Sequence, residues 1–194
     1  MTTKKNVKTK ENGRLSSKFD DWHTPHWVID AAKKIMGNID LDPASNTTAN
    51  AYIQADKFYS VENSGLEHNW FGNIFINPPG GKTARVSNAQ IWWQKAVEEF
   101  ESGRVDNIFW VCFSIEQLNL NPTMFDFLVC TLRHRLKFIK DDYNRPSHGN
   151  ALVFLSRDRS NNMAFARTFE SKGRIFSAID YKQYLINKRL DLTV

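Results

Sequence analysis

An asparagine followed by two prolines, Asn77-Pro78-Pro79, stands directly after the apolar run Ile74-Phe75-Ile76. The run predicts a buried strand, and the prolines end it because they fix φ and lack an N–H for the sheet. The Asn77 side-chain oxygen and the Pro78 carbonyl oxygen are both hydrogen-bond acceptors on this stiff turn. Two such acceptors suit an amino group that must give up its hydrogens. A strand end without chemistry is the alternative interpretation of the same residues.

A second candidate site follows the short segment that contains Asp40 and Asp42. Pro43 and Ala44 begin a turn of small residues after it, and a helix is expected next. Ligands of open α/β sheets bind beyond the carboxyl ends of the strands. The turn lacks the Gly-x-Gly-x-x-Gly pattern of dinucleotide sites, and two carboxylates favour a cofactor with a cationic centre and an amino-acid tail. An aspartate that only caps the helix is the alternative.

A second short strand is predicted over residues 55–59, with Asp56 and Phe58 inside it. An acid at the end of the second strand commonly binds ribose hydroxyls in this architecture. The ring of Phe58 is suited to lie against an adenine. Asp56 and Phe58 are therefore candidate cofactor residues.

Amphipathic helices and a central strand are expected to position these turns. Apolar residues at helical spacing predict a helix that Thr24 caps, Pro25 opens and Gly37 ends. A second helix is predicted over residues 89–102. The run 107–113 has no alternation, which indicates a central strand covered on both faces. Ser114 follows it and is expected to face the same crevice as Asn77.

The remaining segments complete an α/β prediction, with a mostly parallel central sheet and an antiparallel hairpin at its end. Strands are expected at 127–131, 136–140, 151–155 and 174–176, the second and third forming the hairpin around a polar loop at 141–150. The polar, basic segment 82–88, with Lys82 and Arg85, is expected to be mobile and to close over a substrate. No role is assigned to residues 157–194.

Composition narrows the class of protein. The net charge of +5 favours an anionic partner. Residues 1–19 are basic and lack apolar periodicity, which predicts a disordered tail before one domain at 20–194. Cys112 and Cys130 lie in apolar runs, as buried thiols of a reducing compartment would. The sequence has neither metal-ligand spacing nor a membrane-spanning run, so a cytoplasmic protein is expected. It does not fix the oligomeric state, and a monomer is compatible with it.

Six stretches, in this order and spacing, resemble the phage-encoded DNA N-6-adenine methyltransferase (Dam-like) family over roughly residues 20–155. They are Trp22-x-Thr24-Pro25, Asp40-Leu41-Asp42-Pro43-Ala44-Ser45, Ala55-Asp56-Lys57-Phe58-Tyr59, Asn63-Ser64-Gly65-Leu66, Trp70-x-Gly72 and Ile76-Asn77-Pro78-Pro79. The resemblance implies a Rossmann-like methyltransferase fold that uses S-adenosylmethionine and acts on double-stranded DNA with the target adenine flipped out. It also implies DNA modification against restriction by a phage or prophage.

The resemblance also implies roles for particular residues. Asn77, Pro78 and Pro79 would form the catalytic turn that accepts hydrogen bonds from the adenine amine. The cofactor would lie against a set of residues near the strand ends and the first helix: Trp22, Thr24, Pro25, Asp40, Asp42, Pro43, Ala44, Asp56 and Phe58. The substrate would contact residues that follow the catalytic turn and the central strand: Gly80, Gly81, Lys82, Arg85, Trp92, Trp93 and Ser114.

The sequence departs from the family pattern at Gly80, where an aromatic residue is expected to stack on the base. Base–aromatic stacking contributes about 1–3 kcal/mol. Another ring could replace it, with Trp92, Trp93 and Phe113 as candidates. Alternatively, the chain is an inactive protein that binds DNA or cofactor, or a methyltransferase for RNA or for protein amides. Retention of Asn77 and both prolines favours an active DNA enzyme.

Overall fold

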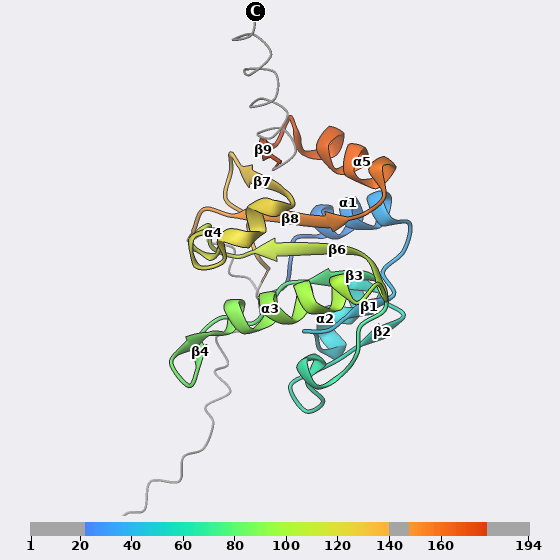
Figure 1. Cartoon of the computed structure of the whole chain (residues 1–194), viewed down its shortest axis with the longest axis vertical. Helices are drawn as coiled ribbons and strands as arrows, with labels where there is room; N and C mark the ends of the chain where they lie inside the picture. The colour runs from blue at the N-terminus through green and yellow to red at the C-terminus, as the bar shows by residue number, and fades with distance from the viewer. Residues whose placement is uncertain (1–21, 140–147, 178–194) are drawn as a thin grey trace, which may run out of the picture.

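Seven strands form a central sheet in the order β2-β1-β3-β6-β8-β7-β9 (Figure 1). The computed structural model describes residues 22–139 and 148–177. The sheet strands are β1 (Leu41–Asp42), β2 (Lys57–Phe58), β3 (Gly72–Ile76), β6 (Val105–Cys112), β7 (Leu128–Leu132), β8 (Ala151–Ser156) and β9 (Gly173–Phe176). A separate hairpin joins β4 (Lys82–Thr83) and β5 (Val86–Ser87).

The sheet has a parallel half and an antiparallel half. β2, β1, β3 and β6 pair in parallel, whereas β8 pairs antiparallel with both β6 and β7, and β9 pairs antiparallel with β7. β1, β2, β3, β6 and β7 therefore run in one direction, and β8 and β9 in the other. This mixed α/β architecture is compatible with the Rossmann-like fold that the resemblance implies. The carboxyl ends of β1, β3 and β6 meet at one edge, as expected of parallel strands.

Helices cover both faces of the sheet. α3 (Asn88–Glu101), α4 (Glu116–Leu120) and the 3-10 turn η2 (Pro122–Asp126) pack on one face. α1 (His26–Met36), α2 (Thr47–Ile53) and α5 (Arg159–Phe169) pack on the other. Every β6 residue from Ile108 to Cys112 is completely buried, because β6 lies between β3 and β8 and under both helix layers. The prediction of a central, doubly covered strand is thus confirmed.

Several sequence predictions need correction. Residues 136–139 form no strand of the sheet; β8 pairs instead with β7 and β6, and Ile139 makes only an isolated bridge to His23. Residues 82–88 contain the β4–β5 hairpin, which the sequence did not indicate, and their mobility stays a prediction. The segment 157–177, which had no predicted helix, contains α5, and β9 includes the predicted strand at 174–176. The tail at 1–19 and most of the 141–150 loop lie outside the described residues.

The two cysteines lie in the protein core. Cys112 and Cys130 are free, buried thiols, as predicted. Burial raises the pKa of Cys112 far above its usual range and that of Cys130 to about 11. Both therefore stay protonated at neutral pH and act as small apolar core residues. In residues 22–139 and 148–177, no helix has the length and apolar character needed to span a membrane.

A buried carboxylate ties α3 to the loop before β3. Glu99 is 2 % exposed; it pairs with Lys95 at 2.5 Å and Arg104 at 2.6 Å, and accepts the Trp70 N–H at 3.2 Å. Burial alone would raise the pKa of Glu99, but these partners together lower it below its ordinary value. Its contribution to stability is therefore complete above the ordinary glutamate pKa of 4.5 and is lost as the pH falls through the lowered value.

Glu99→Gln should lower the free energy of unfolding by about 2 kcal/mol at pH 7, because charged hydrogen bonds are lost. Urea unfolding at pH 7 and pH 3 measures the effect, and the difference from the wild type should shrink at the lower pH. Glu98→Gln, which changes an exposed carboxylate on the same helix, should stay within about 0.5 kcal/mol of the wild type. A constant Glu99→Gln deficit at both pH values would contradict the proposed charge interaction.

Candidate functional site

The Asn77 turn lies at the carboxyl end of β3, as the sequence predicts. β3 ends at Ile76, Pro78 is buried and Pro79 is exposed. The Asn77 Nδ2 donates to the Trp22 carbonyl at 3.4 Å, which brings the segment before α1 against the turn. Within the described residues, neither Asn77 Oδ1 nor the Pro78 carbonyl accepts a hydrogen bond. Both acceptors therefore remain available to an amino group.

The turn continues directly into the β4–β5 hairpin. Asn88, the first residue of α3, anchors the residues between the turn and the hairpin. Its Nδ2 donates to the Gly80 carbonyl at 2.6 Å, and its N–H donates to the Gly81 carbonyl at 3.0 Å. The Thr83 hydroxyl donates to Asn88 Oδ1 at 2.7 Å. No pattern in the sequence marks Asn88. Its amide holds the hairpin at a fixed angle to the Asn77 turn.

Asp42 is a buried carboxylate at the carboxyl end of β1. It is 2 % exposed, and its Oδ1 accepts the Ala44 N–H at 3.1 Å. The buried Ser45 hydroxyl lies near it without completing a well-formed hydrogen bond. Burial outweighs these contacts and raises the pKa of Asp42 to about 7. Within the described residues it has no ion pair, so the site would favour a cation.

The neighbouring motif residues support the Asp42 turn through close packing. A side chain at Gly65 would overlap the Pro43 carbonyl, so only glycine fits against this turn. Trp70 holds Gly65 in place, because its indole Nε1 donates to the Gly65 carbonyl at 2.8 Å. The Ser45 N–H donates to the Tyr59 carbonyl at 2.8 Å, which ties the turn to the end of β2.

The structure places Asp40 and Asp56 at the amino ends of β1 and β2, whereas Asp42 lies at the carboxyl end of β1, so a cofactor role for these two acids stays a prediction. Asp40 precedes β1 and accepts hydrogen bonds from the Asn73 N–H at 2.6 Å and Asn38 Nδ2 at 2.5 Å. It also fills the space beside Gly72, where a Cβ would overlap its carboxylate. Asp56 is exposed and precedes β2. Because each acid stands one residue before its strand, both lie at the amino ends of β1 and β2, whereas Asp42 ends β1.

The segment before α1 approaches the site in a different way from that predicted. α1 begins at His26, its N-cap is Pro25, and no side chain caps it, so Thr24 is not the cap. Thr24 is 4 % exposed and packed inside the protein. Trp22 reaches the site through its carbonyl, which contacts Asn77. Phe58 is half-buried as the last residue of β2.

Two predicted substrate aromatics are core residues. Trp92 is 7 % exposed and stacks on Trp70; Trp93 is 3 % exposed, packs edge-on against Trp110 and donates through Nε1 to the Thr123 hydroxyl at 2.9 Å. Neither ring could meet a base without displacement of α3. The structure therefore separates both from the candidate substrate surface.

The end of β6 does join the site edge. Ser114 is 5 % exposed, and its hydroxyl accepts the Glu116 N–H at 3.3 Å at the start of α4. The half-buried ring of Phe113 lies 3.8 Å from the position of a Cβ at Gly80. The structure therefore brings Phe113, and neither Trp92 nor Trp93, next to the turn.

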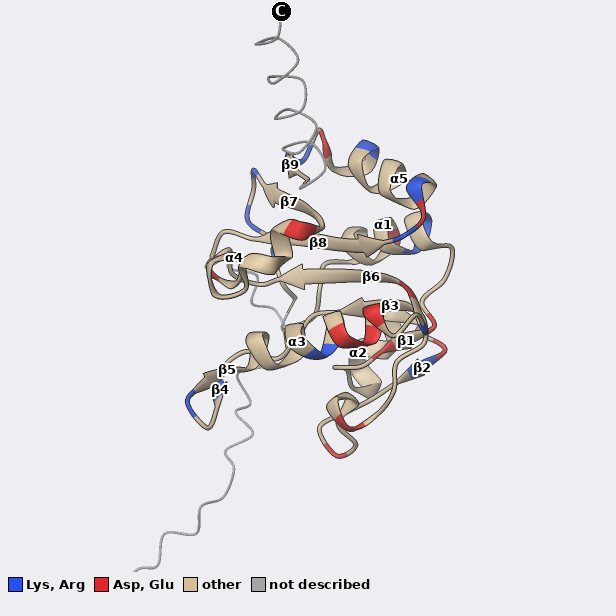
Figure 2. Ribbon diagram, viewed as in Figure 1, with Lys and Arg blue, Asp and Glu red and all other residues tan. Residues whose placement is uncertain are grey.

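Exposed basic residues lie on two segments at the carboxyl edge of the sheet. Lys82 and Arg85 are exposed on the β4–β5 hairpin, whose tip has positive φ at Ala84 (49°) and Arg85 (72°). Arg133, Arg135 and Lys137 are exposed on the segment that follows β7. Figure 2 shows basic residues in blue on the β4–β5 hairpin and beside the end of β7, on the side of the sheet towards which β6 points. This edge is suited to an extended anionic partner.

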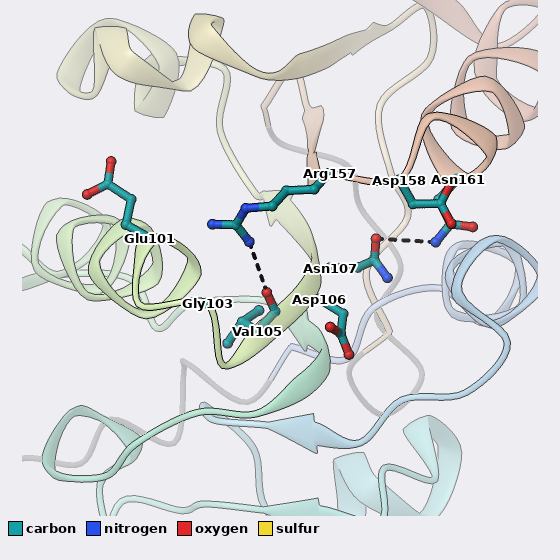
Figure 3. A pocket seen from close by; sticks show the side chains of 8 residues that line it. All are labelled: Glu101, Gly103, Val105, Asp106, Asn107, Arg157, Asp158 and Asn161. Atoms are coloured by element: carbon teal, nitrogen blue, oxygen red, sulfur yellow. Dashed lines mark hydrogen bonds between the residues drawn. The ribbon is translucent and has the colours of Figure 1, made fainter.

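A polar pocket lies at the other edge of the sheet (Figure 3). It is formed around the start of β6 and the end of β8, by Glu101, Gly103, Val105, Asp106, Asn107, Arg157, Asp158 and Asn161. Its side chains bond to one another and to the backbone: Asn161 Nδ2 donates to Asn107 Oδ1 at 3.3 Å, and Arg157 donates to the Val105 carbonyl at 3.4 Å. The pocket thus belongs to the structural amino edge, away from Asn77.

In the part of the chain that the structure describes, no group of three or more His, Cys, Asp or Glu residues is placed to hold a metal ion. Among the residues that the structure describes, the carboxyl edge has two acceptors that receive no hydrogen bond, one buried carboxylate with no ion pair, and exposed basic residues on two segments. These features suit a cationic small molecule and an anionic polymer that presents an amine.

Comparison with known proteins identifies the family. A family model described as DNA N-6-adenine-methyltransferase (Dam) matches residues 11–184, a span that includes the Asp42 turn, the Asn77 turn and all seven strands of the sheet. No curated protein and no solved structure matches the chain. The chain therefore belongs to the DNA N-6-adenine-methyltransferase (Dam) family.

Proposed function

We propose that this protein transfers a methyl group from S-adenosylmethionine to the exocyclic N6 amine of adenine in double-stranded DNA. The observation that carries the proposal is the Asn77 turn, with two unused acceptors at the carboxyl end of β3. Family membership supports adenine in DNA as the target. The same membership argues against an RNA base or a protein amide as the target.

The two acceptors would act on the amine itself. Hydrogen bonds from the two N–H groups to Asn77 Oδ1 and the Pro78 carbonyl hold the nitrogen in one orientation. They also stabilise the positive charge that develops on nitrogen as it forms a bond to carbon. No covalent enzyme intermediate is required. The base must leave the helical stack to reach this turn, because its amine is not accessible to the active site within the duplex.

Asp42 fits a cationic cofactor. S-adenosylmethionine, when bound, supplies an electrophilic methyl group on a sulfonium centre and carries an ammonium group on its amino-acid tail. A buried carboxylate whose pKa is raised to about 7 is unfavourable alone and is stabilised by such a cation. Trp22, Pro43 and Ala44 would line the same site, and Phe58 is the candidate contact for the adenine ring at the end of β2.

The two basic segments are the candidate contacts to the DNA backbone. Lys82 and Arg85 lie on the hairpin that follows the turn, and Arg133, Arg135 and Lys137 lie on the segment that follows β7. Phosphate contacts position a duplex without reading its sequence. The hairpin and the segment after β7 would therefore place the duplex across the carboxyl edge, with the target base above Asn77.

The double variant Lys82→Gln/Arg85→Gln should weaken DNA binding and make it less dependent on salt. Each lost phosphate contact should reduce the slope of log K against log salt by about 0.9. Fluorescence anisotropy with a labelled duplex at several salt concentrations measures this slope. The matched control, Lys34→Gln/Arg159→Gln, removes two exposed charges near the amino edge and should leave the slope unchanged. Equal slopes for both double variants would contradict the proposed contact between the hairpin and the DNA backbone.

We infer from the resemblance that the modification protects phage or prophage DNA from restriction in the host cytoplasm. Expression in a bacterial host that lacks adenine methylation tests the function, because the nucleosides of the host's genomic DNA can be separated and identified by mass spectrometry. N6-methyladenine should appear with the wild-type protein and be absent with Asn77→Ala. Sequencing that detects modified bases would then give the recognition sequence. Absence of modified adenine at full expression would favour the interpretation as a binding protein, which Gly80 motivates.

A further inference from the structure

A base that has left the helix needs an apolar surface to stack on, and such stacking commonly comes from aromatic side chains. Gly80 follows the acceptor turn but has no side chain to offer. Trp92 and Trp93, the nearest aromatic residues of α3, are packed in the core. A stacking surface for the target base must therefore come from an element other than the turn and α3.

We propose that Phe113 supplies the ring on which the target adenine stacks, in the place left open by Gly80. This inference rests on the proposed function. The Phe113 Cζ lies 3.8 Å from the position where a side chain at Gly80 would begin, which is ordinary van der Waals distance. The ring is half-buried and thus keeps an accessible part. Phe113 is the first residue after β6, a strand that neighbours β3, and is not part of the turn itself.

The register of the sheet supports this placement. β3 and β6 pair in parallel up to Ile76 opposite Trp110. Asn77 is the first residue after β3 and Phe113 the first residue after β6, so both follow the carboxyl ends of neighbouring strands. The ring system of an amine bound at Asn77 would therefore lie at the same edge of the sheet as the Phe113 ring.

Asn150 holds Phe113 in position and is a positioning residue that the sequence did not indicate. It is 2 % exposed, and its Nδ2 donates to the carbonyls of Phe113 at 2.6 Å and Cys112 at 3.3 Å. Its Oδ1 accepts the Leu136 N–H at 2.7 Å. The Ile115 N–H donates to the Gly149 carbonyl at 2.8 Å. The backbone on both sides of the ring is thus fixed, as a stacking surface requires.

Phe113→Leu tests the ring while it keeps an apolar side chain. We expect kcat/KM for DNA to fall by about 5- to 150-fold. The affinity for S-adenosylmethionine and the melting temperature should stay at wild-type values. Phe113→Trp should retain activity because it retains a ring. The proposal would be overturned if Phe113→Leu kept the kcat/KM of the wild type. It would also be overturned if Phe113→Trp lost as much kcat/KM as Phe113→Leu.

A second variant separates stacking from a purely structural role. Gly80→Tyr adds a ring at the turn, where the nearest atom to the new Cβ is the Phe113 ring itself. In the Phe113→Leu background this ring would occupy the vacated space, and it should restore most of the lost kcat/KM. A structural role of Phe113 would not be rescued by a ring on another element, so failure of rescue would count against the proposal.

A fluorescent base gives a direct readout of stacking. With 2-aminopurine in place of the target adenine, a base flipped onto Phe113 should be quenched, and the Phe113→Leu complex should be brighter. Equal brightness in both complexes would overturn the proposal. If the wild-type protein methylates no DNA, the proposed function and this inference fail together. An active wild type with an unaffected Phe113→Leu removes only the role of Phe113.

Discussion

Asn77→Ala should lower the rate of methyl transfer by about 10²- to 10³-fold, the loss typical when one preorganised charge-stabilising group is removed. The affinity for S-adenosylmethionine should change by less than about twofold, because in the proposed arrangement the Asn77 oxygen binds the amine and Asp42 binds the cofactor. Single-turnover kinetics and calorimetry measure the two quantities separately. A loss of cofactor affinity as large as the loss of rate would contradict this assignment.

Asn77→Asp is the matched control for Asn77→Ala. Both substitutions remove the Nδ2 donor that bonds to the Trp22 carbonyl, but aspartate keeps an oxygen acceptor in the same place. Asn77→Asp should therefore retain clearly more activity than Asn77→Ala. Equal losses in the two variants would indicate that Asn77 acts mainly by holding the segment before α1.

Asp42→Asn should weaken the binding of S-adenosylmethionine by about 10²-fold or more, since a charged hydrogen-bonded partner contributes about 1.5–3 kcal/mol or more when buried. The same variant should be more stable without cofactor at pH 8. A carboxyl whose pKa rises on folding, here from 3.8 to about 7, weakens the folded state progressively as the pH rises between these values. Calorimetry and thermal unfolding at pH 8 measure the two effects.

The pH dependence and a matched variant test the Asp42 assignment further. Wild-type affinity for the cofactor should rise with pH up to about 7 and then level off, because the cation prefers the ionised carboxylate. Asp42→Asn should lose this dependence. Asp56→Asn changes an exposed acid at the opposite edge and should leave affinity unchanged. A larger loss for Asp56→Asn than for Asp42→Asn would move the cofactor to another site.

Local sequence patterns predict much of this fold. The prolines after Ile76 end β3 where expected, and the uninterrupted apolar run before Phe113 forms the central strand β6. Gly37 ends α1 and Gly103 follows α3, as predicted. These features depend on residues close together in the chain. The position of the Asn77 turn at the edge of the sheet follows from them.

Long-range pairing limits what the sequence reveals. Whether Asp40 or Asp42 reaches the carboxyl edge depends on where the two-residue strand β1 begins, which its parallel neighbours decide. β8 could pair with any nearby strand, and it pairs with β6 and β7. The contacts of Asn150 with Phe113, and of the Phe113 ring with the space beside Gly80, join residues more than thirty positions apart. No local pattern encodes such contacts.

The most direct test of the central claim is transfer of a labelled methyl group from S-adenosylmethionine to unmethylated double-stranded DNA by the purified protein. Digested nucleosides are separated afterwards to show which base carries the label. Label on N6-methyladenine, absent with Asn77→Ala, is the predicted result. Cofactor binding without label on any base would contradict methyl transfer to DNA, and label on cytosine would contradict adenine as the target.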